Sequence, residues 1–118
     1  MTISRGDVVI VNAPFVTRPG GKVRPMLVVQ NNRNNARMAN TILAMITTNT
    51  SRSNEPTQVL IDPQTKTGKP SGLLSVSVVS CENLLTARQA NVKKKIGRLS
   101  DELMQLVDAA LKDSLALA

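Results

Sequence analysis

The sequence has almost no aromatic residues, no histidine and a single cysteine. Phe15 is the only aromatic residue, so the core must be aliphatic, and a nucleic-acid surface that stacks bases on several rings is excluded. Cys81 is the only cysteine, which excludes an internal disulfide and is typical of a reducing compartment. The absence of histidine excludes Ser-His-Asp and Cys-His catalysis and leaves no His and Cys ligand set for zinc.

Long hydrophobic runs are also missing. No apolar run approaches the roughly 20 residues that a membrane-spanning helix needs, and the N-terminus lacks the apolar stretch of a signal peptide. We therefore expect a cytoplasmic protein without a membrane partner. The 118 residues suit one compact domain, so residues 1–118 are predicted to form a single domain.

Positive charge is what the sequence has in excess. Fifteen Lys and Arg residues face eight Asp and Glu residues, for a net charge of +7. Four of the eight acidic residues fall within 101–113, so the chain before them is strongly basic and the C-terminal segment mildly acidic. A basic body favours a polyanionic partner, most often nucleic acid. Charge alone leaves open a surface that serves only solubility.

Short β-branched runs between turn signals predict a sheet of short strands. The predicted strands cover residues 8–11, 26–30, 41–47, 57–62 and 73–81, with a further short strand over 92–97. Pro25 is expected just before the apolar residues of the second strand, at its first position, where a missing N–H is tolerated. Residues 31–40 are expected to form a loop with room for a helical turn, and residues 82–92 have no clear pattern.

Residues 73–81 alternate along the chain, which predicts a half-exposed strand. One face would carry Leu74, Val76 and Val78, and the other would carry Ser75, Ser77 and Val79.

A C-terminal helix is predicted from residue 100 onward. Ser100 is a good N-cap, and the two acidic residues that follow it suit the first helical turn. One apolar face repeats at helical spacing; its residues are Leu99, Leu103, Leu106, Val107, Ala110 and Leu111. Short strands with one terminal helix indicate a mainly β fold (α+β), built as a small, strongly curved sheet or barrel.

Four segments in order resemble the MazF/PemK toxin family. They are RGDVVIVN at 5–12, GGKVRPMLVVQN at 20–31, ILAMIT at 42–47 and KIGRLSDELM at 95–104. The resemblance runs over almost the whole chain, and its most specific part is the Arg-Pro pair followed by an apolar strand and a strand that ends on threonine. It implies an SH3-like β-barrel with a C-terminal helix that works as a homodimer.

The resemblance also implies a function. The chain would be the toxin of a type II toxin-antitoxin system: a sequence-selective, metal-independent endoribonuclease that needs no cofactor and inhibits growth. Its implied partners are single-stranded RNA, a cognate acidic antitoxin, a second copy of the chain and, together with the antitoxin, operator DNA. Cleavage without metal uses the 2′-OH of the RNA and leaves 2′,3′-cyclic phosphate and 5′-OH ends.

Arg24 and Thr47 take the catalytic positions by this resemblance. The guanidinium of Arg24 can grip phosphate oxygens with two N–H groups, and Pro25 stiffens the backbone that carries it. Thr47 can donate a hydrogen bond from its strand end; Thr48 competes, and spacing favours Thr47. Without the resemblance, Arg24 is better explained as a surface residue in an ordinary turn, and Thr47 as an ordinary strand residue.

Five further residues are expected to contact RNA: Thr17, Arg18, Lys22, Ser77 and Asn83. The loop over 16–22 is expected to be mobile and to help choose the RNA sequence. Its charges attract phosphates, which carry no base information, whereas Thr17 and backbone groups could reach base edges.

Three departures from the family pattern favour the second of two alternative functions. The first loop reads VTRP at 16–19, without the acidic residue that family members often carry there. The usual Asp-Ser-Val reads VSV at 76–78, and the usual Gln-Ile-Arg-Thr reads NLLT at 83–86. The first alternative is a CcdB-like toxin that binds an enzyme such as gyrase and does not need Arg24. The second is a catalytically weak nucleic-acid-binding module with an autoregulatory role. The Arg24 and Thr47 pair favours the ribonuclease.

Overall fold

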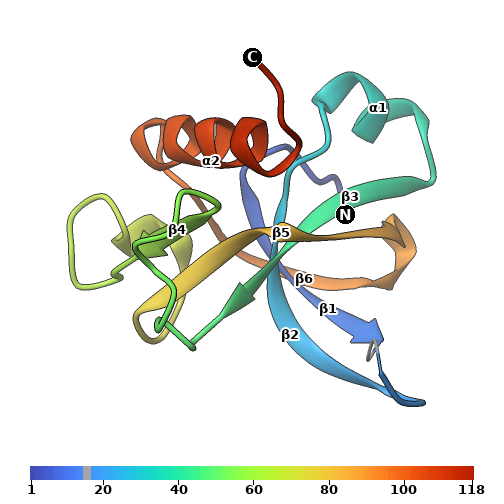
Figure 1. The fold of residues 1–118 in the computed structure, drawn as a ribbon. Coiled ribbons are helices and arrows are strands. Elements are labelled where there is room, and N and C mark those ends of the chain that lie inside the picture. Colours follow the sequence, from blue (N-terminus) through green and yellow to red (C-terminus); the bar gives the residue numbers. More distant parts are fainter. Residues whose placement is uncertain (15–16) are drawn as a thin grey trace.

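The computed structural model describes residues 1–14 and 17–118, in which six strands form one antiparallel sheet (Figure 1). Phe15 and Val16 lie outside the described residues. The strands are β1 (Asp7–Pro14), β2 (Gly21–Val28), β3 (Asn40–Thr47), β4 (Gln58–Ile61), β5 (Ser77–Arg88) and β6 (Val92–Arg98). The helices are α1 (Asn32–Arg37) and α2 (Asp101–Ser114), and the short 3-10 turns are η1 (Lys69–Ser71) and η2 (Gln89–Asn91).

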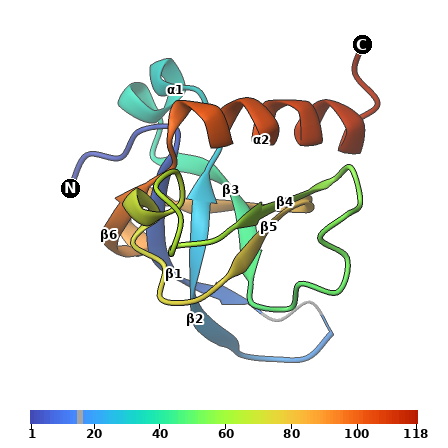
Figure 2. The same ribbon diagram turned by 90° about the vertical axis from the view of Figure 1, so that its left-hand side faces the viewer.

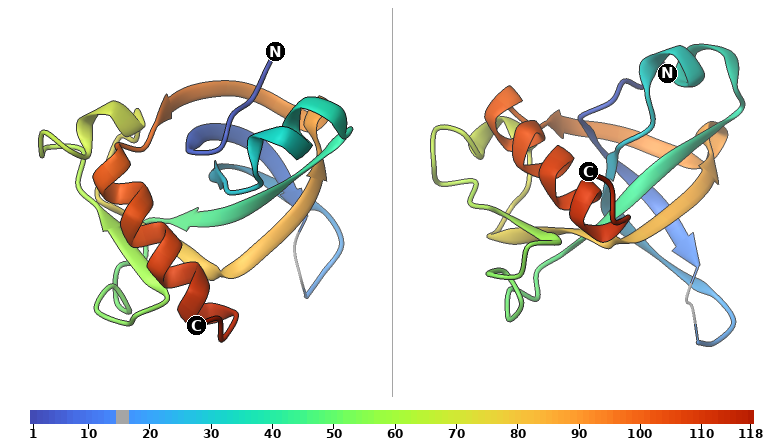
Figure 3. Two further views of the ribbon diagram at one scale, coloured as in Figure 1. Left: turned by 90° about the horizontal axis from the view of Figure 1, so that it is seen from above. Right: turned by 45° about the horizontal axis from the view of Figure 1, so that its top comes forward.

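The strands follow the order β4-β5-β3-β2-β1-β6 and curve around a common centre (Figure 3). The mainly β fold with a C-terminal helix is confirmed, with one correction: the sheet is not closed, because among the described residues the edge strands β4 and β6 do not pair. Instead η1, which follows β4, packs against β6. Gly72, at φ 72°, permits this contact, since a Cβ there would lie 2.0 Å from the Ile96 carbonyl oxygen.

Side chains of the central strands alternate between two hydrophobic clusters, as the pleat requires. Val8 and Ala44 belong to the first cluster, which includes the buried residues of α2. Val9 and Leu43 belong to the second cluster, which is built from β1, β2, β3 and the start of β6. The helix α2 therefore covers one side of the sheet, and the hairpin between β1 and β2 extends away from it (Figure 2).

The helix α2 begins where the sequence predicts. The Ser100 side chain accepts a hydrogen bond of 3.3 Å from the Leu103 N–H, which confirms the N-cap. Leu103 and Val107 are buried as predicted, but Leu106 is 56% exposed and Met104 is buried instead. The buried stripe of α2 is therefore rotated slightly from the predicted one.

The strand β2 begins at Gly21, five residues before the predicted start at 26. Pro25 therefore lies inside the strand and not at its first position. It is tolerated because β2 pairs with β1 along its length but with β3 only from Met26 to Val28. At Pro25 one side of the strand has no neighbour, and a residue without an N–H can occupy such an edge.

The prediction for residues 73–81 is wrong in detail. The strand β5 starts at Ser77 and continues to Arg88 through residues that showed no clear pattern. Leu74 lies before the strand and is 98% exposed, whereas Val78 and Val79 are both buried. Consecutive buried residues arise because this part of β5 lies between β4 and β3 and is covered on both faces.

The remaining elements follow the sequence closely. The predicted strands over 41–47, 57–62 and 92–97 correspond to β3, β4 and β6. The segment 31–40 contains the helix α1, whose N-cap Asn31 accepts a 2.8 Å hydrogen bond from the Asn34 N–H.

Candidate active site

A cleft opens where β2 separates from β3. This first cleft has a volume of about 160 Å³. Its lining includes Lys22, Arg24, Pro25, Thr47, Thr48 and Ser77. The β2–β3 pairing stops at Met26, so the stretch of β2 before it diverges and leaves space beside the end of β3. Residues from three separate segments of the chain thus share one surface.

Arg24 stands on the β2 wall of the first cleft and is half-buried. Its backbone is held by the pairing with Val11, a fully buried residue of β1. Within residues 1–14 and 17–118, no carboxylate forms an ion pair with its guanidinium. A guanidinium placed on a rigid strand without a protein counter-ion is suited to an incoming anion.

Thr47 ends β3 on the opposite wall. Its Oγ1 accepts a 3.1 Å hydrogen bond from the Asn49 N–H, which fixes the side chain. A hydroxyl that accepts in this way keeps its own hydrogen, so Thr47 can donate to a ligand in the cleft. Thr48 also lines the cleft and is exposed.

Ser77 forms the floor beside Thr47, because its neighbour Val78 pairs with Thr47. Its side chain is only 3% exposed, and its Oγ donates to the Ser75 carbonyl at 2.9 Å. The hydrogen of this hydroxyl is therefore engaged, and Ser77 can serve a ligand only as an acceptor.

The structure brings four predicted site residues to the first cleft: Lys22, Arg24, Thr47 and Ser77. Thr17 and Arg18 are exposed in the connection from β1 to β2 and do not line the cleft. The predicted mobility of the loop over 16–22 stays a prediction, and its Val16 is outside the described part of the chain. Asn83 lies elsewhere, in a second hollow.

The second hollow adjoins the first cleft, and Thr47 lines both. It has a volume of about 130 Å³. Its lining includes Met45, Thr47, Arg52, Gln58, Ser80 and Asn83. Sequence reasoning missed Arg52, Gln58 and Ser80. The only local signal was an Arg and a Glu three residues apart in the loop after β3, a spacing that predicts little outside a helix.

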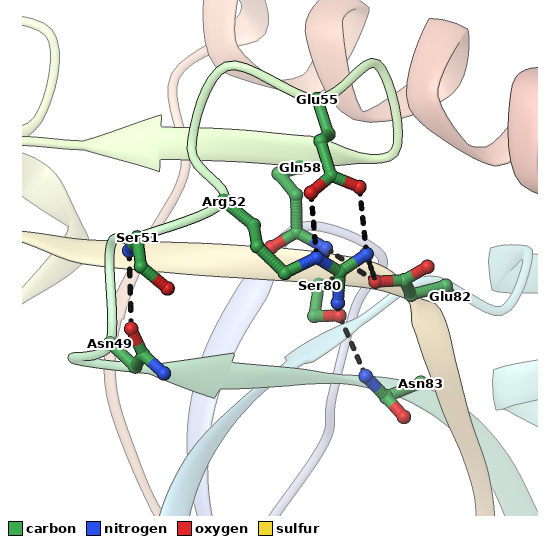
Figure 4. Close-up of polar contacts among 8 residues, drawn as sticks. All are labelled: Asn49, Ser51, Arg52, Glu55, Gln58, Ser80, Glu82 and Asn83. Atoms are coloured by element: carbon green, nitrogen blue, oxygen red, sulfur yellow. Dashed lines mark hydrogen bonds and ion pairs between the residues drawn. The ribbon is translucent and has the colours of Figure 1, made fainter.

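An ion-paired cluster forms one side of the second hollow (Figure 4). Arg52 donates to both carboxylate oxygens of Glu55, at 2.7 and 2.9 Å, and forms a second ion pair with Glu82. These bonds raise the pKa of Arg52, and its hydrogen bond to Glu55 lowers the pKa of that carboxyl. Gln58 Nε2 donates to Glu82 at 2.9 Å and to Ser80 Oγ at 3.3 Å.

Two further observations concern the described residues as a whole. No group of three or more His, Cys, Asp or Glu side chains in them is arranged to hold a metal ion. Neither of their helices has the length and apolar character needed to cross a bilayer.

Known proteins resemble this chain along nearly its full length. Residues 4–115 match the family model described as PemK-like, MazF-like toxin of type II toxin-antitoxin system. Endoribonuclease EndoA from Bacillus subtilis (strain 168) is 38% identical over 118 residues, which cover 99% of this chain and 97% of that protein.

Solved structures share the fold. An endoribonuclease in complex with its cognate antitoxin, from a mycobacterial species, superposes with a TM-score of 0.76 at 23% identity and covers 98% of this chain and 97% of that one. A MazE-MazF structure (Form-III) from Deinococcus radiodurans gives a TM-score of 0.77 at 17% identity over 100% of both chains. At these identities the likeness bears on the fold alone.

Proposed function

The chain belongs to the PemK-like, MazF-like toxin family of type II toxin-antitoxin systems, and from this premise we propose that it is a sequence-selective, metal-independent endoribonuclease that inhibits growth. Single-stranded RNA is the proposed substrate. The observation that carries the proposal is the first cleft, which Arg24 and Thr47 line from neighbouring strands. A relative with 38% identity bears the name endoribonuclease.

The proposed reaction uses the RNA's own nucleophile. The 2′-oxygen bonds to the adjacent phosphorus as its proton leaves, the bond from phosphorus to the 5′-oxygen breaks, and the 5′-oxygen takes up a proton. The products are a 2′,3′-cyclic phosphate and a 5′-OH. DNA lacks the 2′-OH, so the chemistry itself selects RNA.

Arg24 and Thr47 act on the charge that develops during this step. The non-bridging phosphate oxygens gain negative charge, and donors that are already in place stabilise such charge without reorganising. Arg24 supplies a permanent cation with two parallel N–H groups, and Thr47 adds a neutral donor. Neither group is a base at neutral pH, so the proposal gives both of them charge stabilisation and orientation of the phosphate.

The test is cleavage in the absence of free metal. A long single-stranded RNA is incubated with the purified protein in excess EDTA, and the ends are identified by phosphatase and kinase sensitivity. We expect cleavage with cyclic phosphate and 5′-OH ends, and no cleavage of DNA of the same sequence. Activity that stops in EDTA and returns with magnesium would contradict the metal-independent mechanism.

The proposed protein partners are a cognate acidic antitoxin and a second copy of the chain, which would act in the cytoplasm and, with the antitoxin, on operator DNA. The net charge of +7 supports an acidic partner. Three apolar residues on or near β3 and β5 are exposed: Met38, Ile42 and Leu84. Their exposure supports a homodimer in which these side chains are buried. Sedimentation at micromolar concentration should give a dimer, which Leu84→Glu should weaken; a wild-type protein that sediments only as a monomer would contradict it.

The connection between β1 and β2 is proposed to contribute to RNA binding and choice. Lys22 lines the first cleft, and Thr17 and Arg18 are exposed next to it in sequence. The double variant Arg18→Gln, Lys22→Gln should weaken binding to all RNAs alike and flatten the salt dependence. Thr17→Ala should instead change which sites are cut. An unchanged cut-site profile would remove Thr17 from sequence selection.

A further inference from the structure

We propose that the second hollow binds one base of the RNA, next to the phosphate held in the first cleft, and that it prefers a base with an exocyclic amino group. The inference rests on the proposed function, because it assigns a subsite for the same substrate. The position follows from Thr47, which lines both cavities. A phosphate bound at Arg24 in the first cleft and a base bound in the second hollow would thus be separated only by Thr47.

The charge of the second hollow argues against a second phosphate. Its one arginine, Arg52, is ion-paired to the carboxylates of Glu55 and Glu82, which do not themselves line the hollow. One positive and two negative groups leave this cluster net negative in a protein of charge +7. A phosphate would be repelled by the carboxylates, whereas a neutral, polar base would not. The cluster remains reachable, because the Arg52 side chain is 51% exposed.

A break in the strand pairing lies at Asn83, which lines the second hollow, and at the adjacent Glu82, which binds two of its lining residues, Arg52 and Gln58. Ala44 pairs with Leu84, but the next residue of β3, Met45, pairs with Ser80. Residues 81–83 are therefore extra on the β5 side, as in a β-bulge, which redirects side chains and is common beside functional sites. Cys81 of this segment is buried, while Glu82 and Asn83 are exposed. In regular pairing, successive side chains point to opposite faces of the sheet. At this irregularity, the neighbouring side chains of Glu82 and Asn83 are both exposed.

The hydrogen-bonding groups in the cluster are mainly acceptors, which sets the base preference. Asn83 Nδ2 donates to Ser80 Oγ at 2.8 Å, so its carbonyl oxygen, which points away from Ser80 (Figure 4), keeps its accepting capacity. The carboxylate of Glu82 has more acceptor sites than Arg52 and Gln58 occupy. Acceptors of this kind suit the amino groups of adenine, cytosine or guanine, and asparagine amides pair well with adenine. Uracil has no amino group and offers these acceptors only its single N3–H donor.

Arg52 and Gln58 act as positioning residues for these acceptors. Gln58 donates to Glu82 at 2.9 Å and so orients its carboxylate. Arg52 bridges Glu82 to Glu55 and so links β5 to the loop between β3 and β4 (Figure 4). Both residues line the hollow together with Asn83, so the loss of either should weaken the discrimination between bases that Asn83 provides.

The experiment is a cut-site profile on an RNA library with random sequence, read by sequencing the new 5′-OH ends. The wild type should prefer amino-bearing bases at one position beside the cut. Asn83→Ala should reduce that preference by about 10-fold, as expected for one lost base contact, and Arg52→Ala should reduce it less. Asn91→Ala removes an exposed amide from η2 and serves as the matched control, which should keep the wild-type profile.

A wild-type profile that prefers uracil at this position, or one that Asn83→Ala and Glu82→Gln both leave unchanged, would overturn the inference. Binding provides a second readout that does not need turnover: RNAs with a 2′-deoxy cleavage site and a varied flanking base, measured by fluorescence anisotropy. If the wild type fails to cut any RNA, the proposed function fails, but base-dependent affinity that is lost in Asn83→Ala still supports this subsite. Equal affinity for every flanking base would contradict it.

Discussion

The two cavities that meet at Thr47 each contain one arginine, and the two arginines differ in what already holds them. Arg24, in the first cleft, has no ion-pair partner among the described residues. Arg52, in the second hollow, is ion-paired to Glu55 and Glu82. The guanidinium in the first cleft is therefore a cation without a counter-ion in the described part of the chain, whereas in the second hollow it is neutralised by carboxylates and joins two parts of the structure.

The difference shows that a basic protein does not use all its arginines for phosphate. An arginine without a counter-ion attracts an anion and loses little on binding it. An arginine that already donates to two carboxylates must break those bonds first. The backbone adds to the contrast: Arg24 is on a strand fixed by β1, whereas Arg52 is in a loop and depends on its carboxylates for its position.

The strongest test of the comparison is Arg24→Ala. Loss of one preorganised charged donor should reduce the cleavage rate by on the order of 100-fold or more. The thermal midpoint should be nearly unchanged, because the side chain is at the edge of a cleft and not in either hydrophobic cluster. Single-turnover cleavage and thermal denaturation measure the two effects.

Arg33→Ala is the matched control, since Arg33 is an exposed arginine on α1, at the far end of the molecule from the hairpin that carries Arg24 (Figure 1). It should retain near wild-type turnover. If Arg24→Ala retained turnover or toxicity, Arg24 would have no catalytic role, and the enzyme-binding alternative would gain support.

Thr47→Val should have the next largest effect. It keeps the β-branched shape that suits the end of β3 but removes the hydroxyl, at a cost of roughly 10-fold in rate for one neutral hydrogen bond. The bond from the Asn49 N–H is lost as well, so the following loop is less well fixed. Thr47→Ser should restore most of the rate, and a serine variant as slow as valine would show that the methyl group matters instead.

Removing the two carboxylates that bind Arg52 should leave its guanidinium without an ion-pair partner, like that of Arg24. In the double variant Glu55→Gln, Glu82→Gln, the guanidinium loses both charged partners and becomes available to phosphate. We expect the Kd for RNA to fall a few-fold at low salt. The slope of log Kd against log salt concentration should steepen by the amount expected for about one additional phosphate contact. The control is Asp101→Gln, Glu102→Gln, which removes two carboxylates from the start of α2. Equal slopes for wild type and the first variant would show that the carboxylates do not mask Arg52.

The smallest effect concerns Cys81, the buried first residue of the irregular segment 81–83 of β5. Burial raises the pKa of the Cys81 thiol to about 11, so native protein should resist alkylation at neutral pH, whereas protein unfolded in urea should react at once. The raised pKa also means that the unfolded state loses this proton first as pH rises. Stability should therefore fall progressively as pH rises from about 9 to about 11, as the unfolded state releases the Cys81 proton before the folded state does. Rapid alkylation of the native protein at neutral pH would show that the segment opens.

Local patterns in the sequence account for much of the fold. Ser100 with two acidic residues after it marks the start of α2, because capping and the helix dipole act within one turn. The runs that became β3, β4 and β6 stand out because β-branched residues lie between turn signals. The resemblance to the toxin family supplied Arg24 and Thr47 as a pair, which no local pattern relates.

The strand ends and the second hollow were beyond such reasoning. The early start of β2 depends on its pairing with β1, and the extent of β5 to Arg88 depends on its pairing with β3. The ion pair between Arg52 and Glu82 joins residues 30 positions apart, and nothing near either one in the sequence indicates the other.

The sequence by itself determined the aliphatic core, the basic charge, the absence of imidazole chemistry and the cap of the last helix, because each depends on composition or on neighbours within a few residues. Only the tertiary structure decided where β2 leaves β3 and where residues 81–83 interrupt the pairing of β5. These two departures from regular pairing create the two cavities. Register between strands is set by which side chains pack together across the sheet, and that information is spread over the whole chain.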